Sequence, residues 1–200
     1  MKEHRDLNLL VEEAVKDQRK LRHIISLLYD EDMAHRFTAA KALGEVARRK
    51  PELMKQKWLR IYRTFDDTMS CWGIAEALGE IARNLAPQHR RKIIPFLRGL
   101  RKYESCCQGY IWGMCRICQV ERDMITDFIP ELEDFLNSPD VCMRGQALWA
   151  WGELGIKEAT ERIKDFLLDE GETWIYENDS VSMKNIGTIA EEALRKIEIE

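Results

Sequence analysis

The sequence lacks the features that mark membrane, secreted and disordered chains. None of its apolar runs approaches the roughly 18 residues that a membrane-spanning helix needs, and residues 1–20 lack the apolar core of a signal peptide. With 45% hydrophobic and 33% charged residues, the composition excludes a disordered or collagen-like chain. We therefore expect a soluble protein of the cytoplasm that does not bind membranes.

Strand-forming residues and catalytic motifs are also scarce. Val and Thr together number 13, whereas Leu, Ala, Glu, Lys and Arg dominate, which favours helices over strands. The sequence has no GxGxxG, GxxxxGK[ST] or GxSxG motif, so neither a phosphate-binding loop nor a serine nucleophile elbow has support. The four histidines are scattered. We expect no enzyme activity, no catalytic residue and no cofactor.

What the sequence does contain is an internal repeat. Residues 36–47, RFTAAKALGEVA, are followed 35 positions later by residues 71–82, CWGIAEALGEIA. Further copies begin at Ser105, Arg144 and Gly187, at successive spacings of 34, 39 and 43 residues. The clearest copies place small or apolar residues at i, i+3, i+4 and i+7, the period of one helix face. Each copy is therefore predicted to be a helix.

A second apolar helix is predicted before each copy, which makes the repeating unit a helix–turn–helix of about 35 residues. Such units stack with their first helices outside and their second helices lining a concave face. The fold class we predict is all-α, a right-handed α-α superhelix that forms a single domain over residues 1–200. A cap helix over about residues 6–18 precedes five repeats, which span approximately residues 21–50, 52–85, 88–120, 124–155 and 158–198.

One glycine recurs at the same position of four copies. These residues are Gly44, Gly79, Gly113 and Gly152. A glycine inside a helix costs up to about 1 kcal/mol relative to alanine. Its recurrence therefore indicates either tight packing between helices or the close approach of a ligand.

The fourth repeat carries a recognisable motif. Residues 140–152, DVCMRGQALWAWG, resemble the HEAT repeat, in particular its short prokaryotic form, the PBS-lyase-like HEAT repeat. That family typically has an aspartate in the turn and an arginine early in the second helix, here Asp140 and Arg144, and Asp32 and Arg36 match in the first repeat. The resemblance covers about residues 21–198 and implies a scaffold or binding module.

The family pattern is incomplete in the middle of the chain. The second repeat has Asp67 but Cys71 in place of the arginine, and the third repeat has neither residue. The pattern is specific for architecture and implies no particular activity.

The second helices offer candidates for binding a protein or peptide in the concave groove. Aromatic and Met side chains are favoured interface anchors, so Tyr110, Met114 and Trp149 are predicted to hold the partner, unless Tyr110 and Trp149 only cover a neighbouring helix. The residues between 169 and 180 form an insertion in the last repeat that either borders the binding surface or closes the terminal core. The complete set of predicted partner-binding residues is Arg36, Glu80, Tyr110, Met114, Arg144, Trp149, Glu153 and Trp174.

The six cysteines permit a second hypothesis, a metal or redox site at the Cys106–Cys118 cluster. Cys107, Cys115 and Cys118 would share one helix face and could supply thiolate ligands. Packing is the preferred interpretation, because Cys115 occupies a core column of the repeat and Cys is often a small buried hydrophobe. We expect no disulfide framework.

A third hypothesis is nucleic-acid binding, as in the HEAT-like DNA glycosylases. Residues 1–122 carry 24 Lys and Arg against 16 Asp and Glu, whereas residues 123–200 carry 7 against 19. The pI of about 5.7 counts against nucleic acid as the partner, as does the position of the basic cluster on an outer helix. That cluster consists of Arg90, Arg91, Lys92, Arg98, Arg101 and Lys102.

Overall fold

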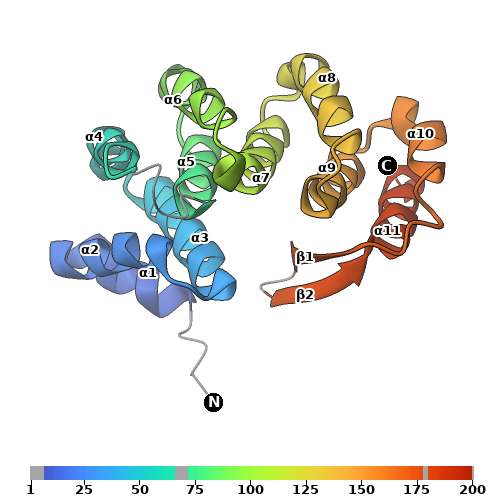
Figure 1. Cartoon of the computed structure of the whole chain (residues 1–200). Coiled ribbons are helices and arrows are strands. Elements are labelled where there is room, and N and C mark those ends of the chain that lie inside the picture. Colours follow the sequence, from blue (N-terminus) through green and yellow to red (C-terminus); the bar gives the residue numbers. More distant parts are fainter. Residues whose placement is uncertain (1–6, 66–71, 178–179, 200) are drawn as a thin grey trace. The chain divides into compact units, whose positions relative to one another are not determined.

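The computed structural model describes residues 7–65, 72–177 and 180–199, so Asp67 and Cys71 of the second repeat lie outside the described residues. Helices dominate the described part of the chain (Figure 1), and the predicted all-α class is confirmed. The chain divides into two compact units, Met1–Gly113 and Met114–Glu200, with the boundary inside one helix.

The first unit consists of one leading helix followed by helix pairs, as the internal repeat of the sequence predicted. Short 3-10 turns, η1 (Leu27–Tyr29) and η2 (Glu104–Cys106), lie inside the first and third pairs. The helices are α1 (Leu7–Lys16), α2 (Gln18–Ser26), α3 (Met33–Arg49), α4 (Pro51–Tyr62), α5 (Trp72–Asn84), α6 (Pro87–Leu100) and the start of α7 (Cys107–Cys118).

The second unit contains the end of α7, two helix pairs and a β-hairpin inserted into the last pair. The η3 and η4 turns span Arg122–Met124 and Lys157–Ala159. The main elements are α8 (Ile125–Leu136), α9 (Val141–Leu154), α10 (Thr160–Lys164), β1 (Glu172–Glu177), β2 (Ser180–Asn185) and α11 (Ile186–Ile199).

The second helices form the interior of each unit. In α5, every side chain from residue 73 to residue 82 is buried. Trp112 of α7 and Trp151 of α9 are each only 2% exposed, so both indoles belong to the core. The outer helices bury one face each, as the i, i+3, i+4 spacing of their apolar residues requires.

The recurring glycine brings successive second helices into backbone contact. A Cβ placed on Gly79 of α5 would lie 2.2 Å from the Cα of Gly113 in α7, and one on Gly152 of α9 would lie 2.6 Å from the Cα of Ala193 in α11. A Cβ on Gly44 of α3 would meet Glu80 of α5 at 2.8 Å. Of the two interpretations that the sequence allowed, tight helix packing is therefore correct at these three positions.

Aspartates begin the second helices of the first and fourth repeats. Asp32 accepts a hydrogen bond from the Ala34 amide at 2.9 Å, and Asp140 accepts one from the Cys142 amide at 2.7 Å. Each satisfies an amide that the first turn of a helix leaves unpaired, an arrangement that typically stabilises a helix by about 1 kcal/mol. The turn aspartates of the repeat motif thus act as N-caps.

The insertion in the last repeat folds as an antiparallel hairpin rather than as an irregular loop. Its register pairs Trp174 with Met183 and Tyr176 with Val181. The inner face packs onto α9, where a Cβ on Gly145 would lie 2.4 Å from Cγ2 of Thr173. Ile175 is also buried, so the hairpin covers part of the core of the second unit.

Candidate functional site

Two of the predicted partner-binding residues, Arg36 and Arg144, hold turns in place. Nη1 of Arg36 donates to the carbonyl oxygens of Asp30 and Glu31, at 2.7 and 3.0 Å. Nη1 of Arg144 donates to carbonyls at the equivalent positions, five and six residues earlier, at 3.0 and 3.1 Å. The shared geometry explains why the arginine recurs in the repeat motif. A fork of fixed donors suits two adjacent carbonyls.

The two arginines differ in what else they contact. Arg36 is only 3% exposed, and burial lowers its pKa despite the nearby carboxylates. Arg144 also forms an ion pair with Asp169, which lies at the base of the inserted hairpin, at 3.2 Å. Arg144 therefore connects the turn before α9 to the start of the insertion.

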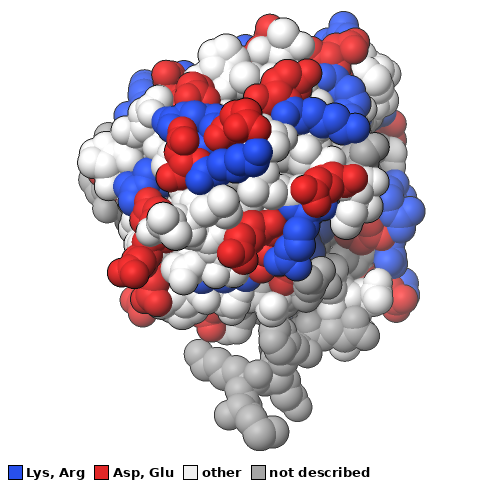
Figure 2. All heavy atoms as spheres, turned by 90° about the vertical axis from the view of Figure 1, so that its right-hand side faces the viewer, with Lys and Arg blue, Asp and Glu red and all other residues white. Residues whose placement is uncertain are grey.

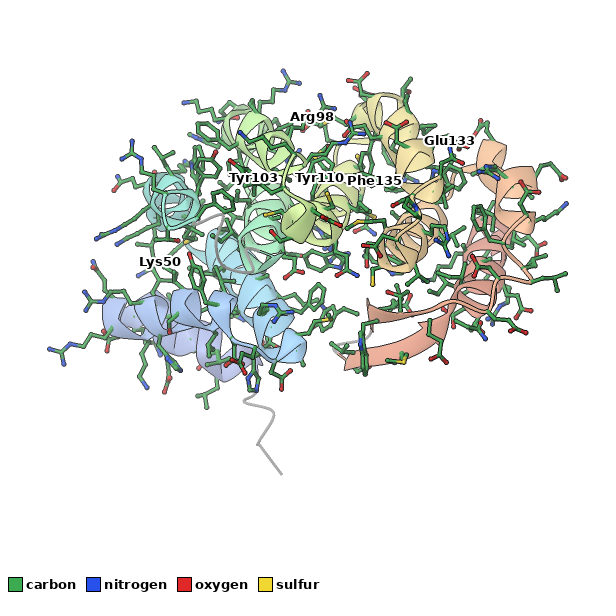
Figure 3. The ribbon with its side chains drawn as sticks, viewed as in Figure 1. Lys50, Arg98, Tyr103, Tyr110, Glu133 and Phe135 are labelled. Atoms are coloured by element: carbon green, nitrogen blue, oxygen red, sulfur yellow. The ribbon has the colours of Figure 1, made fainter. Side chains whose placement is uncertain are left out.

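Other cations bind the carboxyl ends of helices. Arg90, which the sequence assigned to a basic cluster, is 7% exposed and donates to the carbonyls of Ala82 and Leu85 at the end of α5. Lys50, labelled in Figure 3, donates to the Val15 carbonyl in α1 at 2.7 Å. Because unpaired carbonyls carry negative charge at a helix C-terminus, these cations stabilise the helices. Arg90 is consequently unavailable to a phosphate group.

Helix α5 carries two buried carboxyl groups, Glu76 and Glu80, at i and i+4. Glu80 is 4% exposed and lies 3.8 Å from Nη1 of Arg83. Glu76 is 2% exposed, and among the described residues nothing forms a hydrogen bond with its Oε2. Burial raises the pKa of Glu76 from 4.5 to about 8, although the charge of Arg36 opposes this shift. Glu76 thus differs from Glu45 in the same unit, whose pKa is lowered to about 2, first of all by its hydrogen bond with Arg48.

The predicted aromatic and Met anchors are buried. Tyr110 and Met114 of α7 have no exposed surface, and Trp149 of α9 is 5% exposed. The indole N–H of Trp149 has no acceptor in the described part of the chain. A partner that approached from solvent would not reach Tyr110 or Met114 in this conformation.

Glu153 belongs to a charge network within the second unit. Lys196 donates to Glu153 at 2.8 Å and to Glu177 at 2.7 Å, and Lys184 donates to Glu177 at 2.7 Å and to Glu192 at 2.6 Å. Burial disfavours the charge on both lysines, but their hydrogen bonds to carboxylates raise the pKa of each overall. The network ties α9 and α11 to the hairpin, so Glu153 has a structural partner.

Trp174 is the one predicted anchor whose side chain is largely accessible. It is 45% exposed, and its cross-strand partner Met183 is 49% exposed on the same face of the hairpin. The acidic side chains of Glu170 and Glu172 are also exposed nearby in the sequence. Sequence reasoning missed Met183, because only the strand register places it beside Trp174.

The cysteines contribute to packing. The Cys107 thiol donates to the Arg101 carbonyl at 3.2 Å, whereas the Cys115 thiol points to the Ala150 carbonyl at 4.0 Å. Burial raises the pKa of Cys115 well above its ordinary value, which disfavours a thiolate. Within residues 7–65, 72–177 and 180–199, no group of three or more His, Cys, Asp or Glu side chains could hold a metal. Cys106 is disulfide-bonded, which departs from the expectation that the cysteines form no disulfide framework.

The acidic balance of the C-terminal residues does not create a uniformly acidic face. Figure 2, which views the side of the molecule that carries α10 and α11, shows basic and acidic side chains interspersed. On α10, Arg162 pairs with Asp165 at 2.8 Å, and Lys164 pairs with Glu161 at 2.7 Å. Arg162 also reaches Glu133 of α8, labelled in Figure 3, at 3.0 Å.

The fold defines a class of protein, one built from repeated helix pairs whose second helices pack through glycine. Among the helices that the structure describes, none has both the length and the apolar character of a membrane span.

The solved structures that are similar to this chain include the archaeal HEAT-like repeats protein from Thermococcus onnurineus NA1. The two align with a TM-score of 0.41 and 17% sequence identity, over 96% of this chain and 75% of the archaeal chain. No protein-family model matches the sequence, and a search of curated proteins found no match. The narrower resemblance to the PBS-lyase-like form of the HEAT repeat stays a prediction.

Proposed function

We infer that the chain is a non-catalytic protein-interaction module whose accessible anchor is the outer face of the hairpin. The exposed pair of Trp174 and Met183 carries this proposal. Adjoining exposed apolar side chains are typical of interaction surfaces, and Trp and Met are enriched at protein interfaces. The hairpin is also the element by which this chain departs from its own helix-pair repeat.

The other seven predicted binding residues contact other parts of the chain or are buried. Arg36, Arg144 and Glu153 are engaged by other parts of the chain, and Glu80, Tyr110, Met114 and Trp149 are buried. In our proposal these residues fix the helix pairs and the hairpin, and Trp174 contacts the partner. A groove along the second helices stays a prediction.

The chemistry of the partner follows from what surrounds Trp174. Glu170 and Glu172 are exposed on the same segment, while the carboxylates and lysines of the half-buried charge network satisfy one another. An indole ring beside carboxylates favours an apolar segment that carries Arg or Lys, because a cation over a Trp face gains about 0.5–2 kcal/mol. We therefore propose a protein partner with a basic, partly apolar segment.

Selection of short random peptides against the immobilised protein tests the proposal. The enriched peptides are expected to contain Arg or Lys together with apolar residues, and their affinity is expected to fall at least about tenfold in the Trp174→Ser/Met183→Ser variant. Leu168→Ser is the matched control, because Leu168 is 94% exposed on the same unit but lies outside the hairpin. Equal losses in the two variants, or no enrichment, would overturn the proposal.

A further inference from the structure

The outer helices α4 and α6 of the first unit meet along a seam of aromatic side chains. The Phe96 ring lies 5.1 Å from the ring of Trp58 and 4.9 Å from that of Tyr62, centroid to centroid. The Tyr103 ring lies 4.8 Å from that of Phe65. We call these five residues the α4–α6 seam. Four of them, all but Trp58, keep part of their surface exposed.

Exposed cations flank the seam. Arg60 and Arg63 lie at the end of α4, and Lys92 and Lys102 lie on or just after α6. Nζ of Lys102 is 4.9 Å from the centre of the Tyr103 ring. Glu52, which pairs with Lys55, is the only acidic residue within the two helices.

One face of α6 carries a cation, an aromatic ring and a glycine. Lys92, Phe96 and Gly99 stand at i, i+4 and i+7, on one face of α6, whereas Tyr103 (labelled in Figure 3) follows the end of the helix and has an extended backbone. No atom lies within 4 Å of a Cβ placed on Gly99. Gly99 therefore leaves open space one turn beyond Phe96 on this face of α6.

We propose that the α4–α6 seam binds single-stranded nucleic acid. Exposed ring surface supports base stacking, which tolerates any sequence, and the flanking cations supply contacts to phosphates. Arginine suits this role because its planar fork of donors matches a phosphate group. A duplex would engage the cations alone and leave the rings unused. The proposal concerns the first unit and is independent of the hairpin of the second.

A binding assay with fluorescent oligothymidylate and oligouridylate of about 15 nucleotides tests the proposal. Binding is expected to weaken steeply as salt rises, because each neutralised phosphate adds about 0.7 to the slope of log affinity against log salt for single strands. The Arg63→Gln/Lys92→Gln/Lys102→Gln variant is expected to lower that slope by about 2. Comparison of the two oligomers shows whether the strand is DNA or RNA.

The matched control is Arg19→Gln/Lys20→Gln/Arg22→Gln, which removes the same charge from exposed positions of α2, away from the seam. We expect this control to bind like the unmodified chain. The Tyr103→Leu variant retains apolar volume but loses the ring, and its affinity is expected to fall about tenfold, as for the loss of one stacked base. Circular dichroism confirms that each variant is folded.

Four results would overturn the proposal. The first is an absence of oligonucleotide binding at low salt, and the second is an equal loss in the seam variant and the α2 control. The third is tighter binding of a duplex of the same length than of the single strand. The fourth is binding of an acidic peptide or of vesicles rich in phosphatidylserine in preference to the oligonucleotides, since the seam would then recognise a different class of partner.

Discussion

Replacing Gly79 with alanine should destabilise the chain, although alanine is the better helix former. The new Cβ would lie 2.2 Å from the Cα of Gly113 and 2.7 Å from its carbonyl oxygen. Both of those atoms belong to the backbone of α7, so no side-chain rotation can make room. To reach ordinary contact, which begins at 3.4 Å, the two helices must separate by more than 1 Å.

The expected loss follows from two opposing effects. Substituting alanine for glycine inside a helix gains about 1 kcal/mol. Overpacking a filled interior costs about 1–3 kcal/mol, and backbone contact places this site at the upper end, because a gap of about 1 Å forfeits up to half of each lost dispersion contact. The free energy of unfolding should therefore fall by about 2 kcal/mol, which corresponds to about 4–8 °C in melting temperature for a chain of this size.

Urea unfolding followed by circular dichroism measures this change. Gly99→Ala is the matched control, because the same substitution there meets no atom within 4 Å and lies on the exposed side of α6. It should leave stability unchanged or raise it by up to about 1 kcal/mol. If Gly79→Ala proves as stable as Gly99→Ala, the close approach of α5 and α7 does not explain the recurring glycine.

Three further predictions concern titration and hydrogen bonding. Because burial raises the pKa of Glu76 to about 8, the folded state keeps the proton that the unfolded state releases near pH 4.5. The free energy of unfolding should therefore fall as the pH rises from about 4.5 to about 8, by at most about 1.4 kcal/mol per pH unit. Glu76→Gln should flatten this dependence in urea titrations. Arg144→Lys replaces the planar fork of donors by a single ammonium group on a flexible stem and should lose about 1–3 kcal/mol of unfolding free energy. Iodoacetamide should modify the half-buried Cys142 before the buried Cys115, whose raised pKa disfavours the reactive thiolate, as mass spectrometry of the native protein would show.

Each of these predictions has a control and an opposing result. Glu198→Gln changes an exposed carboxylate, so it should keep the pH dependence that Glu76→Gln removes, and equal profiles would contradict the assignment to Glu76. Arg195→Lys on the exposed face of α11 should leave stability unchanged, and a matching loss there would contradict the turn-holding role of Arg144. Labelling of Cys115 at the rate of Cys142 would contradict its burial.

The helix pairs could be predicted because their apolar residues recur at the short, regular spacing of one helix face. Residues 36–47 and 71–82 repeat the same apolar spacing, and the observed α3 and α5 cover most of both segments. The hairpin could not be predicted in the same way. Its second strand, SVSMKN, has few strand-forming residues and depends on pairing with β1, whose Thr173 and Ile175 are buried.

The candidate site shows a second limit. The repeat places Tyr110 and Trp149 at equivalent helix positions. It does not show whether other helices cover these positions, and both side chains are buried. An arginine that holds a turn is also the same residue type as one that binds a phosphate. Only the distances from Arg36 to the carbonyls of Asp30 and Glu31 distinguish the two roles.

Where an arginine holds the turn of a repeat, the number of residues in that turn is restricted. The fork of the arginine reaches carbonyls five and six residues earlier, so an insertion between them would break both hydrogen bonds. The fifth pair has Gly187 at this position, and it is the pair that hosts the hairpin. Protein engineers could therefore graft a binding loop into this turn of the fifth pair, while the arginine-held turns before α3 and α9 stay intact.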